Sequence, residues 1–209
     1  GKKQIITEIT YAIIPDKSGT LKIPQLRYQG EKKTGSTLNR NFGNFGNFDN
    51  FGTLFKTRGQ RIFSTSKPQT VYVNPIPIKN KGWWLPARNL KIIEKWQPEK
   101  PDFKVGEPVT RTLTIIADGV TGNQIPELAL NFPDKIKGYR DQPQIETEHT
   151  ADGLRGIRKE KLALIPGTQG TIILPEIKVN WWDLATNKLR VAVIPSKKIQ
   201  VFKVDGHVK

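Results

Sequence analysis

The sequence predicts an all-β protein of tandem immunoglobulin-like β-sandwich domains, the first of them incomplete. Three observations predict this fold: short apolar runs that alternate with polar residues, 15 Pro and 18 Gly that recur between these runs, and an internal repeat. Alternation with a period of two is typical of strands with one buried face, and Pro and Gly punctuate short strands better than long helices. With 209 residues, the chain is long enough for two small domains that each bury a core.

Four segments in the second half of the chain show the alternation most clearly. Thr, Val and Ile dominate them, and β-branched side chains suit a pleated, half-buried surface. We therefore expect four strands, each with its apolar side chains on one face. Their apolar members are Val109, Leu113, Ile115 and Ala117; Ile177, Val179 and Trp181; Leu189, Val191 and Val193; and Ile199 and Val201.

The internal repeat relates residues 12–26 (AIIPDKSGTLKIPQL) to residues 163–177 (ALIPGTQGTIILPEI). In each copy we expect a strand that ends at the first Pro, a turn closed by Gly, and a second strand interrupted by another Pro. A Pro inside a strand is tolerated only at an edge or a bulge, because it lacks the amide donor. The positions are Pro15, Gly19 and Pro24 in the first copy and Pro166, Gly170 and Pro175 in the second.

The repeat predicts a partial sandwich domain at residues 1–78 and a complete one at residues 79–209, joined by the Pro-containing linker Asn74–Gly82 (NPIPIKNKG). The first domain lacks counterparts of the early strands, and the chain contains no Met, so we expect a fragment of a longer protein. A half sandwich exposes an apolar face and unpaired edges. We expect a second copy, in a strand-swapped homo-oligomer, or a rearranged strand to cover that face.

A low-complexity insertion interrupts the first domain at about residues 32–57 and contains NFGNFGNFDNF. One interpretation is an arm whose aromatic side chains dock on a partner, and the other is an expanded loop without function. The candidate docking residues are Phe42, Phe45, Phe48 and Phe51.

Two Trp pairs, Trp83-Trp84 and Trp181-Trp182, also invite a functional interpretation. Neighbouring side chains of a strand point to opposite faces, so Trp181 is expected inside and Trp182 on the outer face. Trp182 is then either an aromatic anchor for a protein or glycan partner, or it packs beside Trp83 or Trp84.

Composition argues against several classes of function. The net charge of +15 comes from scattered Lys and Arg without a recognition motif, so no nucleic-acid partner is predicted. The absence of Cys excludes disulfides and thiolate sites. The only two histidines, His149 and His207, have no spaced companions, and no catalytic motif is present. We therefore predict no enzyme activity and no catalytic, cofactor-binding or metal-binding residues. Dispersed carboxylates leave glycosidase chemistry unsupported rather than excluded.

Four segments carry a resemblance to a known family: YAIIPDKSGTLKIPQLRY, WWLPARNLKIIEKW, VGEPVTRTLTIIADGVTGNQIPEL, and IPGTQGTIILPEIKVNWWD followed by VAVIP. Together they resemble the BatD (oxygen-tolerance) family of membrane-anchored proteins. The resemblance implies a signal peptide and further sandwich domains upstream, a transmembrane anchor downstream, and a periplasmic location at the inner membrane. It also implies an assembly with von Willebrand A-domain proteins and a MoxR-type ATPase, linked to oxygen or stress tolerance. It supplies no active-site residues.

The expected function is a non-enzymatic protein-interaction module that binds by strand addition or through the Phe-rich insertion. A von Willebrand A domain often binds through a metal that accepts a partner carboxylate, for which Asp183 and Asp118 are candidates. The alternative is a carbohydrate-binding or adhesin-like module that stacks sugars on Trp182.

Overall fold

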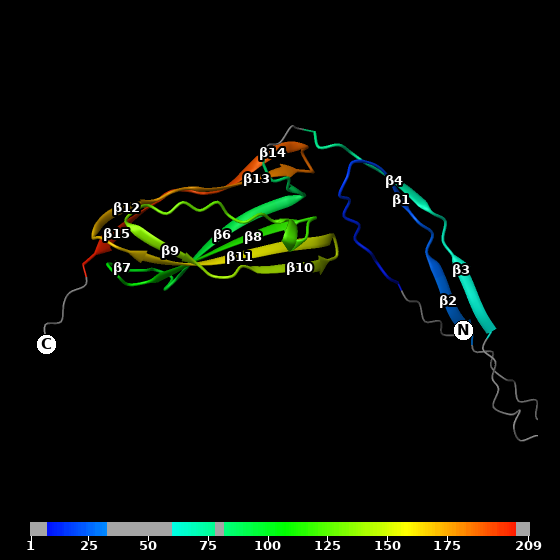
Figure 1. Cartoon of the computed structure of the whole chain (residues 1–209), viewed down its shortest axis with the longest axis horizontal. Coiled ribbons are helices and arrows are strands. Elements are labelled where there is room, and N and C mark those ends of the chain that lie inside the picture. Colours follow the sequence, from blue (N-terminus) through cyan, green and yellow to red (C-terminus); the bar gives the residue numbers. More distant parts are fainter. Residues whose placement is uncertain (1–7, 33–59, 78–81, 204–209) are drawn as a thin grey trace, which may run out of the picture. The chain divides into compact units, whose positions relative to one another are not determined.

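The structure is a computed structural model that describes residues 8–32, 60–77 and 82–203 (Figure 1). Its regular elements are β-strands, apart from one short 3-10 helix, η1 (Gly122–Gln124). The all-β prediction is confirmed, and the several sheets are consistent with a β-sandwich. The chain divides into two units: a smaller one, Ile13–Lys79, and a larger one that contains Asn80–Lys209 and the described residues before Ile13. Each unit is described by itself.

The larger unit is built on a five-stranded antiparallel sheet. Its strand order is β10–β11–β8–β6, and β9 also pairs with β11. The green and yellow strands of this sheet run side by side in Figure 1. The strands are β6 (Asn89–Gln97), β8 (Val109–Asp118), β9 (Ile136–Arg140), β10 (Gln144–Thr150) and β11 (Gly153–Pro166).

Two three-stranded sheets, β12–β15–β7 and β14–β13–β5, complete the larger unit. The strands β5 and β7 add in parallel to β13 and β15, while the other pairs are antiparallel. Pro175 lies between β12 and β13 and Pro195 between β14 and β15, where the missing amide donor ends each ladder. The strands are β5 (Pro86–Ala87), β7 (Phe103–Lys104), β12 (Gly170–Leu174), β13 (Ile177–Asp183), β14 (Lys188–Ile194) and β15 (Lys197–Phe202).

One hydrophobic core joins the three sheets of the larger unit. Leu113 of β8 and Leu164 of β11 have no exposed surface, and they share a cluster with Leu174 of β12, Val179 of β13 and Val201 of β15. The predicted inward faces of the strands at β8, β13 and β15 are therefore confirmed. Burial of these aliphatic side chains is the main stabilising contribution to the unit.

β14 forms as predicted, but the apolar face that was expected inside points away from the core. Leu189, Val191 and Val193 are exposed, whereas Ile194 is buried and Ala192 packs against the core. The pairing with β13 explains the difference, because directly opposed residues of a pair share one face of a sheet. Val179 points into the core and pairs with Ala192, so every second residue from Leu189 points outward.

A buried ion pair interrupts the apolar alternation of β8. Arg111 lies on the core-facing side of the strand, and its Nη2 atom is 2.6 Å from Oε1 of Glu94 on β6. The Arg111 guanidinium also lies 5.3 Å from the ring centroid of Trp96. A charge placed among apolar residues requires such partners, because desolvation without compensation is costly.

The smaller unit is a long antiparallel ribbon, hereafter the ribbon, made of β1 to β4. β1 pairs with β4 and β2 pairs with β3. None of the side chains described in the ribbon is buried. The strands are β1 (Gly19–Ile23), β2 (Arg27–Lys32), β3 (Gln60–Thr65) and β4 (Gln69–Val73).

The ribbon reproduces the pairing register of β12 to β15. Gly19 pairs with Val73 as Gly170 pairs with Val201, and Lys32 pairs with Gln60 as Asp183 pairs with Lys188. Both glycines have a positive φ, 109° at Gly19 and 111° at Gly170, a conformation that other residues rarely adopt. The sequence repeat therefore extends to strand register from Gly19 and Gly170 onward, across hairpin connections of very different length. The strand expected before the first Pro forms only in the second copy, where β11 ends at Pro166, whereas residues 8–15 form no strand.

Candidate functional site

The ribbon carries one surface that the repeat identifies, here called the core-equivalent face. The counterparts of its members in the larger unit are core residues. By strand register they correspond to Ile172, Leu174, Ile177, Val179, Ile199 and Val201, all of which are buried. The core-equivalent face consists of Leu21, Ile23, Leu26, Tyr28, Val71 and Val73.

Exposure distinguishes the two copies sharply. Leu26 is 60% exposed, Tyr28 64% and Val71 46%, whereas their counterparts in the larger unit are at most 4% exposed. Contiguous exposed apolar surface of this kind marks an interaction site more often than it marks an inert surface. The core-equivalent face is therefore the first candidate site.

The edges of the ribbon are open as well. In the larger unit β5 and β7 pair with β13 and β15, the counterparts of β2 and β4. No strand among those the structure describes pairs with the outer edge of β2 or β4. Unpaired amides and carbonyls at a sheet edge can accept a further strand.

Trp182 is not the exposed anchor that the sequence suggested. As expected, its side chain points to the face of β13 opposite to that of Trp181, but only 7% of its surface is exposed. Its ring contacts Trp84 with centroids 5.7 Å apart, and its Nε1 donates to Oδ1 of Asn187. Packing beside Trp84 was the second interpretation of the Trp pair, and it accounts for the buried ring. Trp83 is more than half exposed, and its Nε1 donates to the carbonyl oxygen of Gln124.

Asp183 is likewise buried, so it is not an exposed acid available to a partner's metal. Its carboxylate accepts hydrogen bonds from the Thr186 hydroxyl and from the amides of Ala185 and Thr186, and it pairs with Arg190 at 2.6 Å. These interactions close the β13–β14 hairpin. The bond from the Thr186 side chain is the largest cause that lowers the pKa of Asp183 from its ordinary value of 3.8.

Replacement of Asp183 by Asn should lower the urea midpoint of unfolding at neutral pH, because the charged acceptor of the hairpin is lost. A carboxyl with a lowered pKa stabilises the fold above its unfolded pKa, and this stability is lost as pH falls through the folded pKa. The difference between the two proteins should therefore be complete above about pH 5 and shrink as pH falls below about 4. Urea titrations at a series of pH values measure it, and a difference that stays constant would contradict this role.

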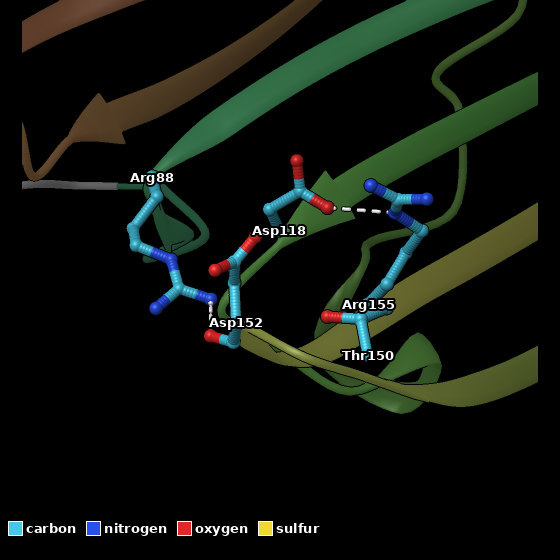
Figure 2. Close-up of a pocket in the computed structure, with 5 residues that line it drawn as sticks. All are labelled: Arg88, Asp118, Thr150, Asp152 and Arg155. Atoms are coloured by element: carbon cyan, nitrogen blue, oxygen red, sulfur yellow. Dashed lines mark hydrogen bonds and ion pairs between the residues drawn. The ribbon is translucent and has the colours of Figure 1, made fainter.

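A polar cavity of about 320 Å³ lies at one end of the five-stranded sheet (Figure 2). It is lined by Arg88, Asp118, Thr150, Asp152 and Arg155. Nε of Arg155 donates to Oδ1 of Asp118 at 2.7 Å, and Arg88 donates to the carbonyl oxygen of Asp152. The hydrogen bond to Asp118 raises the pKa of Arg155 above its ordinary value. Since the two arginines and two carboxylates are equal in number, their charges largely balance.

The remaining predicted features give few further candidates. Phe42, Phe45, Phe48 and Phe51 lie outside the described residues, as does His207. Across residues 8–32, 60–77 and 82–203, no group of three or more His, Cys, Asp or Glu is placed to hold a metal ion. The same residues include no helix with the length and apolar character needed to cross a bilayer.

Comparison with family models, curated proteins and solved structures finds no match to this chain. The fold and the exposed surfaces therefore define the chain only as an all-β protein with sandwich-like sheets, and its resemblance to the BatD family stays a prediction.

Proposed function

We propose that this chain is a non-enzymatic protein-interaction module made of two related immunoglobulin-like domains. The observation that carries the proposal is the ribbon, which exposes a row of large apolar side chains beside open strand edges. Water is a poor environment for such a surface, and burial against a partner would stabilise it. The shared strand register supports the relation between the two domains.

The BatD resemblance supplies the setting of the proposal. In that setting the module acts in the periplasm as part of a protein anchored to the inner membrane, in an assembly with von Willebrand A-domain proteins and a MoxR-type ATPase. Its contribution to oxygen or stress tolerance would be to hold these components together. Sugar stacking on Trp182 is not proposed, because that ring is buried against Trp84.

The test is binding of the 209-residue chain to a soluble von Willebrand A domain of the kind that the BatD resemblance implies, measured calorimetrically with and without magnesium at low and high salt. Saturable binding that persists in high salt is expected, because burial of apolar surface is insensitive to ionic screening. The same titration with bovine serum albumin serves as a control for nonspecific adhesion. Absence of binding, or binding lost with modest salt, would contradict the proposed function.

A further inference from the structure

The outward side of β14 carries a row of exposed aliphatic side chains. Leu189 is 53% exposed, Val191 48% and Val193 43%. They point away from the core that joins the three sheets of the larger unit, so the row is not one half of that core. In the ribbon the same three register positions are held by Arg61, Phe63 and Thr65. The hairpin itself therefore does not require aliphatic side chains at these positions.

β14 is also an edge strand. Its sheet has the order β14–β13–β5, and within residues 82–203 no further strand pairs with its outer edge. The edge strands β6 and β10 of the same unit carry charges on their outward sides, a device that discourages pairing with another chain. These charges belong to Lys91, Lys95, Glu146 and Glu148. The outward residues of β14 are uncharged, so its edge lacks this protection.

The two ends of β14 select one register for pairing with an identical strand. The strand begins after Asn187, which has a positive φ of 53°, and it ends before Pro195, which has no amide donor. Its middle residue is Val191, so only antiparallel pairing centred there engages all 7 residues. In this register Val191 lies opposite Val191 of the second copy, and Leu189 lies opposite its Val193.

The same register keeps like charges apart. Lys188 lies opposite Ile194 of the second copy, and Arg190 lies opposite its Ala192. Arg190 also keeps its partner within its own chain, since its Nε is 2.6 Å from Oδ2 of Asp183. Like charges placed directly opposite would destabilise such a pair. A second β14 therefore meets both requirements on an added strand, aliphatic side chains on the outward face and no cation opposite either cation.

We propose that β14 pairs edge to edge and antiparallel with β14 of a second copy of this chain, about a twofold axis at Val191. The pairing joins the β14–β13–β5 sheets of the two copies and unites their rows of Leu189, Val191 and Val193 on one outward face. Hydrogen bonds along the edge and the cross-strand aliphatic contacts stabilise the dimer. This dimer needs no A domain, so it goes beyond the proposed function.

A single introduced thiol tests the register, because the chain contains no Cys. Directly opposed Cα atoms of an antiparallel pair are about 4.5 to 5.5 Å apart, a separation that a disulfide can span. Val191→Cys should therefore form a disulfide-linked dimer in oxidising buffer, measured by non-reducing electrophoresis. Ile173→Cys is the matched control, since Ile173 is a 62% exposed aliphatic residue of another edge strand, β12. It should cross-link at least about tenfold more slowly, and equal rates would refute the proposed register.

Light scattering over a concentration series measures the dimer without a cross-link. The 209-residue chain should approach the mass of a dimer as its concentration rises. Val191→Lys places two ammonium groups opposite each other at the twofold axis, and it should raise the dissociation constant about tenfold. Ile173→Lys adds the same charge on β12 and should change that constant less than about twofold. Circular dichroism spectra that match the wild type establish that both variants fold.

Three outcomes would overturn the β14 dimer. The first is a chain that stays monomeric at every concentration. The second is a dimer that Val191→Lys and Ile173→Lys weaken equally, because net charge and not the β14 edge would then control association. The third is a dimer that survives Val191→Lys but dissociates with Leu26→Ser, which would assign the contact to the core-equivalent face of the ribbon. A dimer lost in Val191→Lys alone supports the β14 contact, whether or not the A domain binds.

Discussion

Replacement of Glu94 by Ala is expected to lower the free energy of unfolding of the larger unit by about 3 kcal/mol. The substitution leaves Arg111, whose side chain is only 5% exposed, without its counter-ion on the core-facing side of β8. A buried charge without a partner destabilises the fold by more than the intact ion pair stabilises it, and the contact with the Trp96 ring compensates for only part of this loss. Because 20% of the Glu94 side chain is exposed, the effect lies at the lower end of the range for buried pairs. Urea unfolding followed by Trp fluorescence measures it.

The double variant Glu94→Leu with Arg111→Met is the control for this prediction. It removes both charges and leaves no unpaired buried charge, so its free energy of unfolding should be closer to that of the wild type than that of Glu94→Ala is. A loss below about 0.5 kcal/mol for Glu94→Ala would contradict the assignment of the pair as a buried structural element.

The second large effect is expected at Leu174, which is 1% exposed in the core of the larger unit. Leu174→Ala should cost about 3 kcal/mol, from lost burial and the cavity that remains. At the size of this unit such a loss lowers the melting temperature by about 10 °C. Differential scanning calorimetry of the whole chain measures it.

Ile23→Ala is the matched control, because Ile23 occupies the register position of Leu174 in the ribbon. With no buried side chain described around it, Ile23 should contribute less than about 0.5 kcal/mol to stability. The main transition should stay where it is in the wild type. A loss at Ile23 comparable to that at Leu174 would mean that the ribbon already has a core within this chain.

Much of the fold was predictable from local pattern. The alternation from Val109 to Ala117 predicted β8, and the shared Gly and Pro positions of the repeat predicted the turns at Gly19 and Gly170 and the interruptions at Pro24 and Pro175. These features depend on the chemistry of single residues: branched side chains favour pleats, glycine permits positive φ, and proline lacks a donor. The effects of such local chemistry can be predicted from the sequence without a tertiary structure.

The candidate site was predicted less well. Trp182 was expected on the outer face of a strand and Asp183 as an exposed acid, but both are buried. Trp84 covers the first, and the hairpin residues Thr186 and Arg190 surround the second. Alternation assigns residues to two faces but does not say whether the outer face is covered. That depends on segments distant in sequence or on the closure of a turn.

The sequence by itself determined that the chain is all-β and that one hairpin pattern occurs twice. Only the tertiary structure decided which copy has a core. The same register buries Ile177 and Val179 under a five-stranded sheet and leaves Leu26 and Tyr28 exposed. It also turned Leu189, Val191 and Val193 outward, against their apolar character. The physical reason is that a side chain is buried only when a second surface packs against it. The pattern of a strand determines which face is apolar, and the presence of another sheet or segment on that face determines whether it is buried.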